Sequence, residues 1–215
     1  MENGITELYY NFLKYLEEEK DKIALIQLTG KIEDYLVKEF VYYIYKKTEG
    51  KTFALVNLGI RGEKKIDIVL LKGNMDNPVI HSLIEAKYLR NKHRITNYDA
   101  TDEISTSLKS LHEQIGPFKS ETLGGYKVKL SARSKNIYGL VFASYVSKVQ
   151  KDEQNKKCFY KRILRIAEKF FRYHDLKKPY FRFIFDDVYV NVLNTKFYVS
   201  LRAGLWKNAE NGDVK

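Results

Sequence analysis

The chain has 215 residues, of which 44% are hydrophobic and 30% are charged, so it can bury a core and its composition is not that of a disordered protein. Lysine and arginine number 38 against 27 acidic residues, and the net charge of +11 favours polyanionic partners, nucleic acid before an anionic membrane surface. The single cysteine, Cys158, excludes an intramolecular disulfide, a cysteine-based zinc site and a four-cysteine iron–sulfur cluster.

Three further absences in the sequence bear on location and cofactors. No uncharged run approaches the roughly 18 residues that a membrane-spanning helix needs. The N-terminal residues MENGITELYY lack the charged and then apolar layout of a signal peptide. We therefore expect a cytoplasmic protein with no membrane partner. No G-x-x-x-x-G-K-[ST] loop occurs, so we expect no nucleotide cofactor.

The first part of the chain predicts two helices and then three strands. Apolar residues recur at helical spacing in the two helical segments, and a turn rich in Gly, Asn and Pro precedes the third strand. The predicted helices are residues 5–22 and 31–47, and the predicted strands are residues 53–60, 64–71 and 79–89.

The rest of the chain predicts further alternation of helix and strand. A nearly all-apolar fourth strand, residues 136–146, is typical of a central strand that is covered on both faces. The other predicted elements are a basic loop at 90–94, helices at 99–115 and 156–174, and β-structure at 180–206 with a turn at Asn194 and Thr195. This order predicts an α/β fold with a mixed central β-sheet flanked by helices.

Three charged residues stand inside the second and third predicted strands. Asp67 lies between Ile66 and Ile68, where a carboxylate has no packing role, and a buried charge is costly unless it is paired or binds a metal. Glu85 and Lys87 are two residues apart in SLIEAKYLR, so the period of two puts them on one face of the third strand. Because a tight turn joins the two strands, we expect Asp67 and Glu85 to converge with Lys87 beside them.

A fourth charged residue, Glu33, points inward from the second predicted helix. At about 100° per residue it falls in the middle of that helix's apolar arc. Three carboxylates and a lysine can hold Mg²⁺ or Mn²⁺, which take oxygen ligands. Such an ion lowers the pKa of a bound water and neutralises charge on a phosphate, while the lysine orients that water. This chemistry is metal-assisted hydrolysis of phosphodiesters.

At these residues the sequence resembles the PD-(D/E)xK nuclease superfamily, whose members share the restriction-endonuclease-like fold. The resemblance covers roughly residues 30–146 and lies in GKIEDYLV, KIDIVLL and LIEAKYL, in the family's order of elements. It implies a mixed sheet flanked by helices, with Asp67, Glu85 and the Ala86 carbonyl as metal ligands. It also implies that Lys87 is the catalytic lysine and Glu33 an accessory acid.

Two positions near the motif allow other interpretations. Ile66 stands where the motif's name places proline, and Asp76 is nearer to Glu85 than Asp67 is. Asp76 lies in the predicted turn, so we prefer Asp67. The structural alternative is an internal salt bridge of Lys87 with Glu85 or with Asp67 at a strand end.

Two basic segments are candidates for contact with DNA phosphates. The loop RNKHR follows the predicted site directly and contributes Arg90, Lys92 and Arg94. The helix predicted over residues 156–174 carries a cationic stripe opposite its apolar side. The stripe consists of Lys157, Lys161, Arg165, Lys169 and Arg172. Like charges repel each other unless an anion lies beside them, so phosphate contacts would account for the stripe. The alternative is a solvated face of a basic protein.

The sequence therefore predicts a Mg²⁺- or Mn²⁺-dependent DNA nuclease, expected to be an endonuclease, in a single domain of residues 1–215. Its restriction-endonuclease-like core would span about residues 30–146, and a basic helix and β-hairpin over 156–206 would extend it. The alternative is a non-catalytic nucleic-acid-binding module of the same fold, and RNA stays open as the substrate. We expect a homodimer, because two cuts on antiparallel strands need two sites related by a twofold axis.

Four other polar residues have ordinary interpretations. His81 shares the parity of Glu85, but we expect it to be packed or exposed rather than to bind metal. Gln114 lies near the end of the helix predicted over 99–115 and is expected at the surface. Asp186 and Asp187 are expected to form a bend between strands.

Overall fold

The computed structural model describes residues 3–30, 32–59, 65–73, 79–91, 137–170 and 181–207. The helices are α1 (Asn3–Glu18), α2 (Lys20–Thr29), α3 (Ile32–Thr48) and α5 (Glu153–Phe170). The strands are β1 (Thr52–Gly59), β2 (Lys65–Lys72), β3 (Val79–Arg90), β4 (Ile137–Ser147), β5 (Arg182–Val192) and β6 (Thr195–Lys207). The helix predicted over residues 99–115 lies outside the described residues. So do Asp76, Lys92, Arg94, Gln114, Arg172 and the side chain of Lys169.

The first predicted helix is wrong in extent. The structure has two helices there, because α1 ends at Glu18 and α2 runs from Lys20 to Thr29, through residues for which no helix was predicted. Leu16 and Ile23 are both buried, so the two helices cover the same core. Gly30 ends α2 with a φ of 111°, a conformation that side chains disfavour. None of the described helices is both long enough and apolar enough to cross a membrane.

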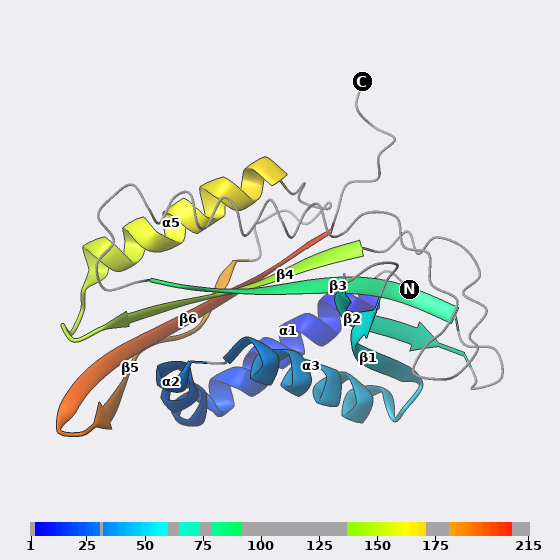
Figure 1. Cartoon of the computed structure of the whole chain (residues 1–215), viewed down its shortest axis with the longest axis horizontal. Coiled ribbons are helices and arrows are strands. Elements are labelled where there is room, and N and C mark those ends of the chain that lie inside the picture. Colours follow the sequence, from blue (N-terminus) through cyan, green and yellow to red (C-terminus); the bar gives the residue numbers. More distant parts are fainter. Residues whose placement is uncertain are drawn as a thin grey trace.

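The strands form one six-stranded sheet in the order β1-β2-β3-β4-β6-β5 (Figure 1). β3 and β4 run parallel, whereas the other neighbouring pairs are antiparallel, so the sheet is mixed. β6 pairs with β4 along most of its length, which makes the C-terminal hairpin part of this sheet. The predicted α/β class, a mixed sheet flanked by helices, is therefore confirmed.

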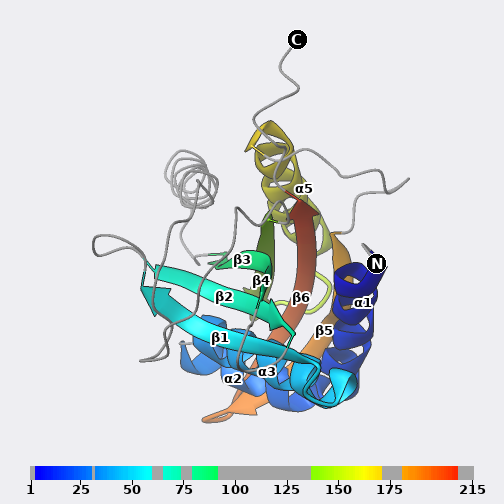
Figure 2. The ribbon, with the colours of Figure 1, turned by 90° about the vertical axis from the view of Figure 1, so that its right-hand side faces the viewer.

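Helices cover both faces of the sheet. Helices α1 to α3 lie against one face and α5 lies against the other (Figure 2). The alternation of side chains sorts the strand residues between two cores: Ile68, Ile84 and Leu140 pack with α1 to α3, and Val141 packs with α5. β4 is buried on both faces, as its apolar sequence predicted.

On the α5 face, the ring of Trp206 lies across Gly204. A Cβ atom on Gly204 would stand 2.2 Å from Cη2 of the indole, so no side chain fits at this position while the ring is there. Trp206 is buried, and its ring centroid lies 6.2 Å from that of Phe181. The absence of a side chain at Gly204 thus lets a large aromatic ring lie flat on the sheet.

Candidate functional site

β2 and β3 separate at the point where the predicted acids lie. Their pairing ends where Ile68 faces Ile84, although β2 continues back to Lys65 along β1 and β3 continues to Arg90 along β4. Beyond Ile84, therefore, one edge of β3 has no neighbouring strand among the described residues. The backbone N–H and C=O groups on that edge need other partners.

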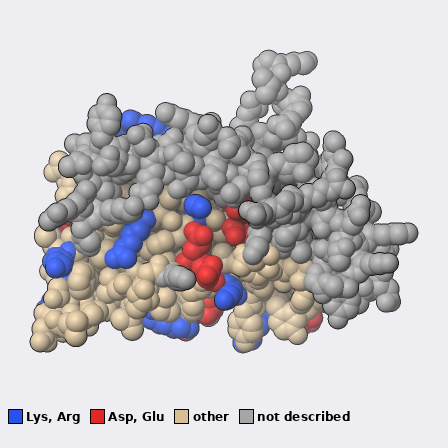
Figure 3. Space-filling view, in the orientation of Figure 1, with Lys and Arg blue, Asp and Glu red and all other residues tan. Residues whose placement is uncertain are grey.

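Three carboxylates supply partners at this fork. The Ala86 N–H donates to Asp67 Oδ2 at 2.7 Å, and the Tyr88 N–H donates to Glu33 Oε2 at 2.5 Å. Across the fork, the Asp67 N–H donates to Glu85 Oε2 at 3.3 Å. A strand, its neighbour and the first turn of α3 thus each bring one acid to the same edge. Figure 3 shows a band of acidic side chains on this side of the molecule, where β3 passes the start of α3 in Figure 1.

The surroundings of these acids favour their protonated forms. Burial is the largest cause, and it raises the pKa of Glu85 to about 8, with the nearby charge of Asp67 adding to the effect. Burial also raises the pKa of Asp67 and that of Glu33, against the opposing effects of their N–H donors and of Lys87. Asp67 and Glu85 act on each other's ionisation, and burial of the pair favours a protonated carboxyl group.

Lys87 lies on the same face of β3 as Glu85 and is half-buried. Its positive charge acts on Glu33, Asp67 and Glu85. Within the described part of the chain it forms no ion pair shorter than 4.0 Å, so the salt bridge that was the structural alternative is not formed there. The ammonium group is therefore near the acids without being taken up by one of them.

The three acids do not surround a single point. Glu33, Asp67 and Glu85 do not bring one oxygen each within 4.8 Å of one another. Asp67 and Glu85 form a pair, and Glu33 lies further along the edge, at Tyr88. The N–H and C=O groups of one strand residue point to the same edge, so the Ala86 carbonyl lies on the edge where its N–H meets Asp67. Two carboxylates and one carbonyl are thus available to a cation.

Among the described residues, the acids that do gather this closely are Glu153, Asp186 and Asp187. Lys156 Nζ lies among them, at 2.9 Å, 2.8 Å and 3.2 Å from their respective oxygens. Burial acts to lower the pKa of Lys156, but the hydrogen bonds to the three acids outweigh it and raise the pKa. An ammonium group therefore occupies the place a metal ion would take. The bend predicted at Asp186 and Asp187 is instead an irregularity within β5.

The described cationic residues that were expected to contact DNA lie on two elements, α5 and β3. Lys157, Lys161 and Arg165 are exposed on α5, and Arg90 is half-buried at the end of β3. On the opposite side of α5, Phe159 and Ile163 are buried, so the predicted amphipathic character is confirmed. Exposure is what both interpretations of the stripe require, and it does not choose between them.

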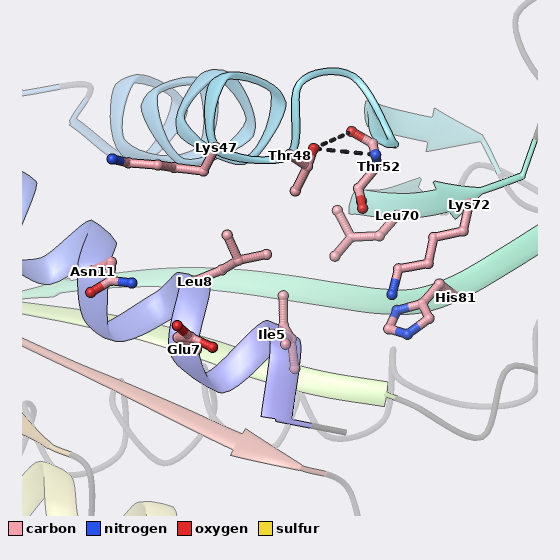
Figure 4. A pocket seen from close by; sticks show the side chains of 11 residues that line it. Ile5, Glu7, Leu8, Asn11, Lys47, Thr48, Thr52, Leu70, Lys72 and His81 are labelled. Carbon is pink, nitrogen blue, oxygen red and sulfur yellow. Dashed lines mark hydrogen bonds between the residues drawn. The ribbon is translucent and has the colours of Figure 1, made fainter. Parts of the chain in front are cut away.

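His81 lies near the start of β3, four residues before Glu85. It lines a separate cavity of about 380 Å³, whose apolar wall includes Ile5 and Leu8 (Figure 4). Burial lowers the pKa of His81, and the Lys72 charge beside it adds to this effect. His81 is therefore not one of the groups at the fork, in keeping with its expected ordinary role.

Sequence reasoning missed two cations that the structure singles out, Lys156 and Arg202. Lys156 precedes Phe159 by three residues and Ile163 by seven, so its place on the apolar side of α5 was visible in the spacing. Arg202 stands in an apolar strand, as Asp67 does, and the same criterion would have marked it.

Comparison with known proteins identifies no relative. No family model, no curated protein and no solved structure matches the chain.

Proposed function

We propose that this chain is a Mg²⁺- or Mn²⁺-dependent DNA nuclease with a restriction-endonuclease-like core. The observation that carries the proposal is the position of Asp67 and Glu85 at the β2–β3 fork, where the Asp67 N–H donates to Glu85 and the Ala86 N–H donates to Asp67. Lys87 lies on the face of Glu85 and is in no ion pair among the described residues. The order α3, β1, β2, β3 and the parallel pairing of β4 with β3 support the same core.

The oxygen atoms at the fork fit a hard divalent cation. Asp67 and Glu85 would hold it through their carboxylates, and Ala86 through its carbonyl. Because burial raises the pKa of Glu85, we expect cation binding to release a proton. When bound, the ion would neutralise charge on a phosphate and make a coordinated water more acidic.

The other residues of the fork have distinct roles in this proposal. Lys87 binds a phosphate oxygen or orients the attacking water, because its ammonium group donates hydrogen bonds and has no carboxylate partner among the described residues. Glu33 holds the Tyr88 N–H and so fixes the stretch of β3 that carries Glu85 and Lys87. Its negative charge also acts on Lys87.

DNA is the proposed partner because of the net charge of +11 and the exposed cations of α5. A homodimer related by a twofold axis would place two such sites on the antiparallel strands of a duplex. Sedimentation of the protein with and without DNA measures whether it forms this dimer.

The direct test is cleavage of plasmid, linear duplex, single-stranded and branched DNA with Mg²⁺, with Mn²⁺ and with a chelator. Asp67→Asn and Lys87→Ala should each lower the rate by at least about a hundredfold. The exposed residues of α2 supply matched controls, Asp21→Asn and Lys20→Ala, which should leave the rate unchanged. Wild-type protein that cuts none of these substrates, or site variants that cut as fast as the controls, would refute the enzyme proposal. The same assays on RNA of matched sequence decide the sugar preference.

One observation favours the second candidate, a non-catalytic nucleic-acid-binding module. The acids at the fork already accept hydrogen bonds from Ala86 and Tyr88, so they have a structural role without a metal. Calorimetry with Mn²⁺ separates the two functions. The nuclease should bind the ion and lose it in Asp67→Asn, whereas the module should show no such binding.

A further inference from the structure

On the α5 face of the sheet, the guanidinium group of Arg202 is surrounded by aromatic rings. Its Cζ atom lies 3.5 Å from the ring centroid of Phe183, 4.5 Å from that of Tyr160 and 5.9 Å from that of Phe181. The rings come from β5, from α5 and from the residue that precedes β5. These contacts hold the planar group in one orientation, as stacked arginines often are.

Arg202 forms no ion pair among the described residues, although the charge of Asp186 acts on it from a greater distance. Among the described residues it has no carboxylate within 4.0 Å, and its Nε has no hydrogen-bond partner. The side chain is half-buried, and burial lowers the pKa of the guanidinium group. Half-buried cations are commonly paired with carboxylates, so a cation that is held rigidly without such a pair is suited to an anionic ligand.

Arg202 lies on the same face of the sheet as Lys87. Across β3, β4 and β6, Lys87 is aligned with Val141 and Gly204. Two residues further along β3, Leu89 is aligned with Ala143 and Arg202. With strands about 4.8 Å apart and about 3.3 Å per residue, the Cα atoms of Lys87 and Arg202 are about 12 Å apart. One strand of a duplex advances 3.4 Å per nucleotide, so this separation corresponds to about three or four nucleotides.

Phe183 gives this place a second binding element. It pairs directly with Arg202 across β5 and β6, and it is 40% exposed although it is a large aromatic residue. Its ring meets that of Tyr160 edge-on at 5.5 Å, which fixes its plane. An exposed ring of fixed orientation beside a cation is the combination on which unpaired bases stack in proteins that bind single strands.

We propose that Arg202 and Phe183 form a subsite for an unpaired nucleotide, with a backbone phosphate on the guanidinium group and the base against the exposed ring. The inference rests on the proposed function, because it makes the substrate a DNA strand with unpaired nucleotides near the cleaved bond. Single-stranded or branched DNA is then preferred to a continuous duplex.

Binding without cleavage tests the subsite. The full chain carrying Asp67→Asn, in chelator, is titrated into labelled oligodeoxythymidylate and into a labelled duplex of the same length, at several salt concentrations. Arg202→Gln should weaken binding of the single strand at least fivefold and reduce the salt slope by about one. Phe183→Leu keeps an apolar side chain but removes the ring, and should weaken single-strand binding by about 5- to 100-fold with little effect on the duplex.

Arg182→Gln is the matched control. Arg182 is the exposed neighbour of Phe183 and stacks on Tyr10, on the face of the sheet covered by α1 to α3. Its replacement should leave both affinities unchanged. Single-strand affinities of Arg202→Gln and Phe183→Leu equal to that of the control would overturn the subsite. So would equal losses on single strand and duplex.

Two further comparisons keep the outcomes distinct. If Arg202→Gln is unfolded at the assay temperature, Arg202→Lys replaces it, because lysine keeps the charge without the planar group. Wild-type single-strand affinity in both single variants, Arg202→Lys and Phe183→Leu, overturns the proposal. If the wild type cleaves DNA but the variants bind single strands as tightly as the wild type does, the subsite is refuted and the nuclease is not. If the wild type cleaves nothing but Arg202→Gln weakens binding, the nuclease is refuted and the subsite is not.

Discussion

The raised pKa of Glu85 predicts an unusual dependence of stability on pH. The pKa of Glu85 is raised from 4.5 to about 8 in the folded protein, first by burial and then by the charge of Asp67. Between these two values the folded protein holds a proton that the unfolded chain releases. The contribution of Glu85 protonation to the free energy of unfolding is therefore complete below pH 4.5 and is lost as the pH rises through about 8.

The size of this effect follows from the shift. One pKa unit corresponds to about 1.4 kcal/mol, so the free energy of unfolding should fall by at most about 4 kcal/mol between pH 5 and pH 8. Glu85→Gln has the shape of the protonated acid and can still accept the Asp67 N–H, but it does not titrate. The variant should match the wild type near pH 5 and exceed it near pH 8.

Urea unfolding followed by circular dichroism from pH 5 to pH 8 measures this difference, with the exposed Glu17→Gln as control. Titrating groups away from the fork are common to both proteins, so their effects cancel in the comparison. The coupling between Asp67 and Glu85 does not cancel and is part of the measured difference. Parallel stability curves for wild type and Glu85→Gln would refute the argument. The same proton predicts that Mn²⁺ affinity rises by up to about tenfold per pH unit below pH 8, which calorimetry in buffers of different ionisation enthalpy detects as proton release.

Three further predictions concern single positions. Lys156→Met should lower the free energy of unfolding by about 1–3 kcal/mol, because three acids lose their shared donor. The exposed Lys157→Met should change the free energy of unfolding by less than about 0.5 kcal/mol, and equal effects of the two variants in urea unfolding would contradict this. Gly204→Ala should lower the free energy of unfolding by about 1–3 kcal/mol and shift the Trp206 fluorescence, because the new Cβ meets the indole ring. Gly4→Ala is the control: nothing lies within 4 Å of its added Cβ, so the fluorescence should not change. Glu33→Gln keeps an acceptor for the Tyr88 N–H, so it should slow cleavage with little loss of stability, and cleavage at the wild-type rate would exclude an accessory role.

The layered fold could be predicted from periodicity because each face of the sheet has its own core. Ile68 and Ile84 alternate with Val69 and Glu85, and that alternation alone places them toward α1 to α3. The break between α1 and α2 was missed because apolar spacing continues across it, from Leu16 to Ile23. Spacing reports which side of a helix is buried and is insensitive to a single residue that interrupts the helix.

The candidate site was less predictable because its geometry depends on where two strands stop pairing. The sequence placed Asp67, Glu85 and Lys87 on one side of the sheet, but no local pattern marks the end of the β2–β3 pairing at Ile68. The clustering of Lys156 with acids was missed for a similar reason. Asp186 is 30 residues away along the chain, and the contact depends on an irregularity in β5.

The identity of the groups at the fork favours a ligand-binding role over a structural one. The N–H groups of Ala86 and Tyr88 have no strand partner on this edge and need side-chain acceptors. The side-chain oxygen of an asparagine or glutamine would accept these hydrogen bonds without burying an acid. The chain instead places Glu33, Asp67 and Glu85 there, where burial raises the pKa of each. Carboxylates in such surroundings lower stability at neutral pH unless a cation compensates them. In the proposed nuclease, oxygen donors that backbone N–H groups already hold in place would bind the cation with little rearrangement.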